Sequence, residues 1–167
     1  MSDTLAPETI DPRALRDCCG SFATGVTVIT TRTPEGDHGT TVSAFMSVSL
    51  DPPLIAISLD RRSKMLDKLR VSGRYAVSVL SGHMRAHALH FSGRRDETLQ
   101  NLFLEHDGLP VLREAAALLV ADVVQQVDAG DHVIVLGQVR HLDRDPEAAP
   151  LLVHAGQFGQ LASDLSR

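Results

Sequence analysis

The chain has 167 residues, of which 43% are hydrophobic and 22% charged, a composition typical of one globular domain with its own core. With a net charge of −5, no Trp, one Tyr and five Phe, it offers neither the basic patch nor the aromatic platform of a nucleic-acid-binding protein. No apolar run could span a membrane and no apolar signal region begins the chain, so we expect a cytoplasmic protein without a membrane partner. Residues 1–10 are expected to be a flexible tail, followed by a single domain over residues 11–167.

A helix is predicted directly after this tail. Asp11 can cap free backbone amides, and Pro12 at the first helical position loses no hydrogen-bond donor that the helix needs. Gly20 is expected to end the helix. The only two cysteines, Cys18 and Cys19, are neighbours, which disfavours a disulfide between them, and two thiols alone make no zinc site. We expect both to be buried on this helix.

Three β-branched runs follow the helix, separated by proline-bearing turns. Apolar residues alternate with period two in the first run, as on a strand with one buried face. Strands are therefore expected at residues 25–33, 39–49 and 53–60. The second of them is rich in small hydroxyl side chains, namely Thr40, Thr41, Ser43 and Ser47. These side chains either hold a flat polar ligand against the backbone or line the wet face of an ordinary sheet.

The rest of the chain continues this alternation of short elements. Helices are expected at 63–73, 83–91 and 96–104, and strands at 75–80, 118–127, 132–142 and 151–154. Alternating βα units are absent, and many short strands predict an antiparallel barrel or sandwich. Residues 118–124 and 133–139 are apolar on both alternating faces, more than one barrel interior needs. A homodimer that buries one face is expected, unless helices of the same chain cover it.

A cluster of basic residues surrounds the start of the 63–73 helix: Arg61, Arg62, Lys64, Lys68 and Arg70. The Ser63 hydroxyl, the free helix amides and Lys64 could bind a phosphate there. The alternative is a solvated helix of mixed charge, because Asp67 interrupts the cluster.

Two sets of histidines are candidates for chemistry. His132, after a tight Gly-Asp turn, could contact a ligand at the barrel mouth or simply cap the turn. His83 and His87 share a helix face, with His90 beyond, but without a zincin motif or a further ligand we predict no metal site. The glycine fingerprint of a dinucleotide fold is also absent, so any nicotinamide cofactor is not held by a Rossmann unit.

Six motifs in order resemble the flavin reductase family, the short-chain NAD(P)H:flavin oxidoreductase component of two-component flavin monooxygenases. They are FATGVTVITT, TTVSAFMSVSLDPPLIAISLD, SGRYAVSVLS, HFSG, GDHVIVLGQV and PLLVHAGQF. The resemblance covers residues 13–160. It implies a mainly β fold, an antiparallel split β-barrel of the FMN-binding type with a few short peripheral helices.

The resemblance also implies which residues form the site. The isoalloxazine ring would lie against Thr41, Val42, Ser43 and Ala44. The ribityl-phosphate end would meet Ser58, Leu59, Ser63 and Lys64, with the turn Phe91, Ser92 and Gly93 nearby. His132 would be the catalytic residue beside the nicotinamide or flavin. Ser78 stands where the family usually has Asn, which weakens or replaces that contact, and Val153 and Ala155 replace the usual Tyr and Arg.

The function implied is hydride transfer from NADH or NADPH to N5 of FMN or FAD, chemistry that the two cofactors themselves carry. A partner flavin-dependent monooxygenase would receive the reduced flavin, and the resemblance also implies a homodimer. Two alternatives remain open. One is a flavin-binding split barrel acting in electron transfer, sensing or as an oxidase, and the other is a ligand-binding barrel without flavin.

Overall fold

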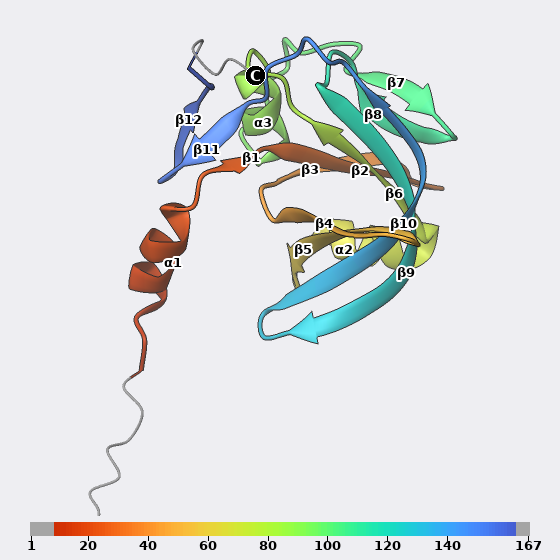
Figure 1. Cartoon of the computed structure of the whole chain (residues 1–167). Coiled ribbons are helices and arrows are strands. Elements are labelled where there is room, and N and C mark those ends of the chain that lie inside the picture. Colours follow the sequence, from red (N-terminus) through yellow and green to blue (C-terminus); the bar gives the residue numbers. More distant parts are fainter. Residues whose placement is uncertain (1–8, 163–167) are drawn as a thin grey trace, which may run out of the picture.

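The computed structural model describes residues 9–162 and is dominated by strands (Figure 1). Its three helices are α1 (Pro12–Gly20), α2 (Lys64–Ser72) and α3 (Arg85–Phe91). Its strands are β1 (Thr24–Gly25), β2 (Thr27–Thr33), β3 (Gly36–Val42), β4 (Phe45–Leu50), β5 (Pro53–Asp60), β6 (Arg74–Val79), β7 (Phe103–His106), β8 (Leu109–Leu112), β9 (Ala117–Ala129), β10 (His132–Arg144), β11 (Leu152–His154) and β12 (Gln157–Gly159).

The largest sheet has seven strands in the order β3-β2-β6-β9-β10-β5-β4, all antiparallel. Its two edge strands, β3 and β4, are consecutive in the chain and joined only by Ser43 and Ala44. The sheet must therefore curl until its edges meet at this link, without a ladder between them. The predicted split-barrel fold is confirmed, and the split lies at residues that the sequence assigns to the flavin site.

The barrel interior is filled by apolar side chains from the sheet and from α2, which packs across one end. Met65, Leu66 and Leu69 of α2 are fully buried there. Tyr75 is also fully buried, and a Cβ added at Gly137 would lie only 2.3 Å from its hydroxyl oxygen. Glycine at this position therefore makes room for the largest side chain of the core.

The caps of two helices agree with the sequence prediction. The Asp11 carboxylate accepts from the amides of Arg13 and Ala14, and the Ser63 hydroxyl accepts from the amide of Met65. The prediction that Cys18 and Cys19 are buried is wrong: both are exposed, because α1 buries none of its residues and projects from the barrel. The predicted tail at 1–10 lies outside the described residues except for its last two.

The helix predicted at 96–104 is wrong. This segment is a loop that leads into β7, which pairs with β8 through the two-residue turn Asp107-Gly108. Both turn residues have positive φ, at 49° and 79°, as the favoured hairpin turn requires. The predicted strand 39–49 is also broken at Ser43 and Ala44. Among residues 9–162, no helix is long and apolar enough to cross a membrane.

Candidate functional site

Most of the predicted site residues line two hollows. The first, here called the α2–α3 pocket, has a volume of about 980 Å³ and includes Ser63, Lys64, Phe91, Ser92 and Gly93. The second, here called the β4–β10 hollow, has a volume of about 510 Å³ and includes Ser43, Ala44, Ser58 and His132. Residues from four distant stretches of the chain are thus brought together in two places.

Two segments of the chain run from one hollow to the other. Thr40 lines the α2–α3 pocket and Ser43, three residues later, lines the β4–β10 hollow. Ser58 lines the hollow and Ser63 the pocket, and the Ser58 amide donates to the Ala44 carbonyl at 3.1 Å. The two hollows are therefore connected by two short segments beside the barrel split, as the site of one elongated ligand would require.

Lys64 is the one cation of the predicted basic cluster that remains available to a ligand. The other four pair with carboxylates within 3.1 Å: Arg61 with Asp128, Arg62 with Asp60, Lys68 with Glu35 and Arg70 with Asp67. Among the described residues, no carboxylate lies within ion-pair distance of Lys64. Together with the Ser63 hydroxyl at the start of α2, its ammonium group offers a phosphate a charged contact.

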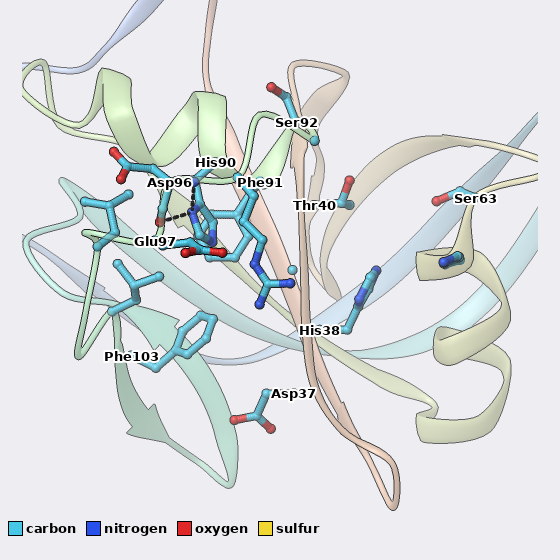
Figure 2. Close-up of a pocket in the computed structure, with 16 residues that line it drawn as sticks. Asp37, His38, Thr40, Ser63, His90, Phe91, Ser92, Asp96, Glu97 and Phe103 are labelled. Atoms are coloured by element: carbon cyan, nitrogen blue, oxygen red, sulfur yellow. Dashed lines mark hydrogen bonds between the residues drawn. The ribbon is translucent and has the colours of Figure 1, made fainter.

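The opposite wall of the pocket is the end of α3 and the turn that follows (Figure 2). Gly93 has φ +100°, and the Ser92 hydroxyl donates to the carbonyl of Leu89 at 2.8 Å. Phe91 lies flat on β3 because Gly39 has no side chain; a Cβ there would approach the ring to 2.7 Å. A small residue at position 39 is thus part of the pocket's construction.

The β4–β10 hollow is mainly apolar, with a few polar groups at its rim. Phe45, Met46 and Ile134 are among its apolar lining residues. His132 lies opposite Asp60 in the β5–β10 register, and its Nδ1 lies 2.7 Å from the Asp131 carboxylate. Hydrogen bonds from Arg62 hold the pKa of Asp60 at about 2, so an ionised carboxylate faces this histidine.

The β9–β10 turn that carries His132 is held by Arg61. Its guanidinium donates to the Gly130 carbonyl at 2.7 Å and pairs with Asp128 at 2.9 Å, while its amide donates to the Asp131 carbonyl at 3.0 Å. Arg61 is therefore a positioning residue for the turn rather than a contact for a phosphate.

Four predicted site residues have side chains engaged within the fold. The Thr41 hydroxyl donates to the Ala88 carbonyl at 2.7 Å and so ties α3 to β3. Val42 and Leu59 are buried in the barrel core, which leaves only their backbone for a ligand. Ser78 is fully buried, lines neither hollow, and its hydroxyl accepts from the Leu112 amide at 2.9 Å. Its side chain serves to hold β8.

The histidines of the α3 region do not converge on one point. His83 lies 2.9 Å from a carboxylate oxygen of Glu114. His90 instead has its Nδ1 within 3.0 Å of both the backbone amide and the carbonyl of Asp96. Burial lowers the pKa of His87. Within residues 9–162, no group of three or more His, Cys, Asp or Glu side chains could hold a metal ion.

Several pocket residues were not predicted from the sequence. His38, on β3, faces Ser63 in Figure 2, and Phe103 lies on the other side of β3. Arg95 also lines the pocket. Burial, and then the nearby Lys68 and Lys64, lower the pKa of His38. Phe22 lines the second hollow although its side chain is 77% exposed. The Asp107-Gly108 turn signal could have predicted the β7–β8 hairpin that carries Phe103.

Comparisons with known proteins agree with this geometry. A family model described as flavin reductase like domain matches residues 19–162. An NADH-dependent flavin reductase from a Rhodococcus species is 41% identical over 160 residues, which cover 94% of this chain and 90% of that protein.

Two solved structures have the same fold over nearly their whole length. The flavin reductase PheA2 has a TM-score of 0.88 at 42% identity, covering 92% of this chain and 100% of the other. The NADH:FAD oxidoreductase SgcE6 of Streptomyces globisporus, in complex with NAD and FAD fragments, has a TM-score of 0.85 at 34% identity, covering 95% and 99%.

Proposed function

Because this chain belongs to the flavin reductase family, we propose that it transfers a hydride from NADH to FMN or FAD and hands the reduced flavin to a partner monooxygenase. The resemblance seen in the sequence motifs is confirmed by the family match, and the chain is a flavin reductase, as predicted. The nicotinamide donor, the choice of flavin and the residue roles below are the finer parts of the proposal.

One observation carries the proposal: two short segments, residues 40–44 and 58–63, connect the polar α2–α3 pocket to the apolar β4–β10 hollow. A flavin has the same division, with a flat ring system at one end and a phosphate at the other. Lys64, whose charge no described carboxylate neutralises, and the Ser63 hydroxyl suit the phosphate. Ser43 and Ala44 are exposed residues, and the Ser43 hydroxyl suits the polar edge of the ring.

The two cofactors together supply the hydride chemistry. The protein orients them and provides a surface from which water is excluded. Ala44, Phe45 and Ile134 line the hollow and would exclude water from rings bound there. His132 presents an imidazole at the rim, where the Asp131 carboxylate fixes its orientation. A ring nitrogen there can hydrogen-bond to a carboxamide and so position a nicotinamide.

The test is an assay of NADH oxidation by the purified chain with FMN, with FAD and with no flavin. We expect oxidation only when flavin is added. Flavin binding without any NADH oxidation, by protein whose circular dichroism shows a folded β-protein, would contradict the proposal and favour an electron-transfer or sensor role.

We also propose that the working unit is a homodimer. Large apolar side chains of β4, of β9 and of the segment before β1 remain exposed in the described chain: Phe22, Met46, Val48, Leu50, Val124 and Val127. Helix α1 buries none of its residues and therefore does not cover β4 or β9. Because Phe22 and Met46 also line the β4–β10 hollow, a second copy would complete that hollow. Light scattering that gives a mass near 18.0 kDa, the mass of one chain, would contradict the dimer.

Delivery of reduced flavin to a monooxygenase rests on the family resemblance, and it is tested by adding the chain to a flavin-dependent monooxygenase that lacks its own reductase. Substrate oxidation should then depend on this chain, NADH and flavin together. The cytoplasmic location predicted from the sequence stays a prediction.

A further inference from the structure

The α2–α3 pocket is larger than a single phosphate group requires. Its volume of about 980 Å³ is at the upper end of the range for whole ligand sites. Ser63 and Lys64 form only one end of it. The remainder is enclosed by β3 and by the loop that follows α3 (Figure 2). The pocket therefore has room for a ligand that continues well beyond the phosphate.

A second unpaired cation lies in this remaining space. Arg95 lines the pocket, and among residues 9–162 no carboxylate lies within ion-pair distance of its guanidinium. Two of the three acidic side chains in the wall are already engaged. The Arg32 guanidinium donates two hydrogen bonds to the Asp37 carboxylate, at 2.7 Å and 3.0 Å. The amide and the hydroxyl of Thr98 both donate to the Asp96 carboxylate. The pocket thus offers a second anionic group a guanidinium in addition to Lys64.

Beyond Arg95 the wall becomes aromatic. Phe91 and Phe103 are half-buried, and their ring centroids are 5.9 Å apart. Partly exposed rings of this kind provide a surface on which a nucleobase can stack. The exposed Glu97 carboxylate also lines this end, and a carboxylate is the usual protein partner of ribose hydroxyls. Cation, aromatic surface and carboxylate are the groups that recognise an adenylate.

We propose that the far end of the α2–α3 pocket is an adenylate subsite, and that through it this enzyme prefers FAD to FMN. Arg95 is the specificity-determining residue, because its guanidinium meets the second phosphate of FAD, which FMN lacks. This inference rests on the proposed flavin site. The adenylate of FAD is favoured over that of NADH because the subsite is continuous with Ser63 and Lys64, where the first flavin phosphate ends.

The chain offers a matched control for Arg95. Arg94, the preceding residue, carries the same charge and is likewise exposed, but it lines a separate hollow with Arg85 and Phe158. The experiment compares wild type, Arg95→Ala and Arg94→Ala in titrations with FMN and FAD, followed by flavin fluorescence. The KM for NADH is measured in parallel with FMN as the flavin.

Wild type should bind FAD more tightly than FMN. Arg95→Ala should weaken FAD binding about tenfold, while FMN affinity and the KM for NADH stay within about twofold; Arg94→Ala should change none of the three. If Arg95→Ala loses FMN and FAD affinity equally, or keeps its FAD affinity, the inference is overturned. Continued FMN reduction by the protein would then leave the proposed function intact. A raised KM for NADH in Arg95→Ala would assign the subsite to the nicotinamide dinucleotide and also overturn it. A wild-type protein that reduces neither flavin would instead overturn the proposed function.

Discussion

The two hollows of the site differ in almost every physical property. The α2–α3 pocket is polar and is built from a helix start, an edge strand and a loop, with Lys64 and Arg95 as its free cations. The β4–β10 hollow is apolar and is built almost entirely from regular strands, with His132 at its rim. Charge therefore selects the ligand at one end, and shape and exclusion of water select it at the other. Substitutions at the two ends should accordingly affect different ligands.

The largest effect is expected from Lys64→Ala. A charge-assisted hydrogen bond to a phosphate is worth about 1.5–3 kcal/mol, so FMN affinity should fall about tenfold or more. Riboflavin, which has no phosphate, should be much less affected. Titration of both flavins, followed by fluorescence, measures the difference.

Lys68→Ala is the control for this prediction, because Lys68 lies one helical turn away and pairs with Glu35 at 3.0 Å. This variant should bind FMN nearly as wild type does. If Lys64→Ala weakens riboflavin and FMN binding equally, Lys64 acts through folding rather than through the phosphate.

A substitution in the barrel core, which supports both hollows, should affect both alike. In Gly137→Ala the new Cβ would lie 2.3 Å from the Tyr75 hydroxyl and 2.7 Å from its ring, and overpacking of a core costs about 1–3 kcal/mol. The melting temperature should fall by about 2–4 °C for each kcal/mol in a chain of this size. Gly159→Ala, where nothing lies within 4 Å of the added Cβ, should melt as wild type does. Equal melting temperatures for the two variants would show that the core accommodates the methyl group.

The two hollows also differ in how far the sequence predicted them. The sequence pattern predicted strands at 53–60 and 132–142, where β5 and β10 lie, but it did not separate β4, which has no buried residue, from β3. Ser43 and His132 were candidates from the residues themselves, and the resemblance added Ala44 and Ser58. The structure brings all four together. Their roles toward a flavin stay predictions.

The α2–α3 pocket was predicted at its capped helix from local chemistry, and at Phe91, Ser92 and Gly93 from the family resemblance alone. Ser63 and Gly73 mark the ends of α2 by local chemistry, and such signals depend on few residues. The sequence of the opposite wall shows no hydrophobic periodicity. The apolar residues at 96–104 were interpreted as a helix, although they form a loop and the start of β7. The sequence also could not show which of the five clustered cations stays unpaired. Their pairing depends on carboxylates distant in the sequence, such as Asp128, and no local pattern reveals it.

At the apolar end, His132→Ala should affect the nicotinamide rather than the flavin. Loss of one ordinary hydrogen bond, about 0.5–1.5 kcal/mol, should lower kcat/KM for NADH about twofold to tenfold with little change in FMN affinity. His83→Ala is the control, because His83 is exposed and pairs with Glu114 away from both hollows. Steady-state kinetics that match wild type in His132→Ala would assign His132 to the turn alone.

The smallest effect is expected from His38 and concerns pH. Burial and the nearby Lys68 and Lys64 lower the pKa of His38 in the folded protein below its ordinary value of 6.5. Below pH 6.5 the unfolded chain therefore binds more protons at this residue than the folded chain does. The contribution of neutral His38 to the free energy of unfolding is therefore complete above pH 6.5 and is lost as the pH falls toward the lowered pKa.

His38→Gln keeps a polar side chain at this wall of the α2–α3 pocket but removes the titration. Its melting temperature should fall less than that of wild type when the pH is lowered from about 7.5 to about 5.5. The pKa of His87 is also lowered, so the measured quantity is the difference between the two proteins rather than the wild-type slope alone. Parallel melting curves for both proteins across this pH range would mean that protonation of His38 costs the folded state nothing. In that case neither the burial of His38 nor the nearby lysines would disfavour its charged form in the folded protein.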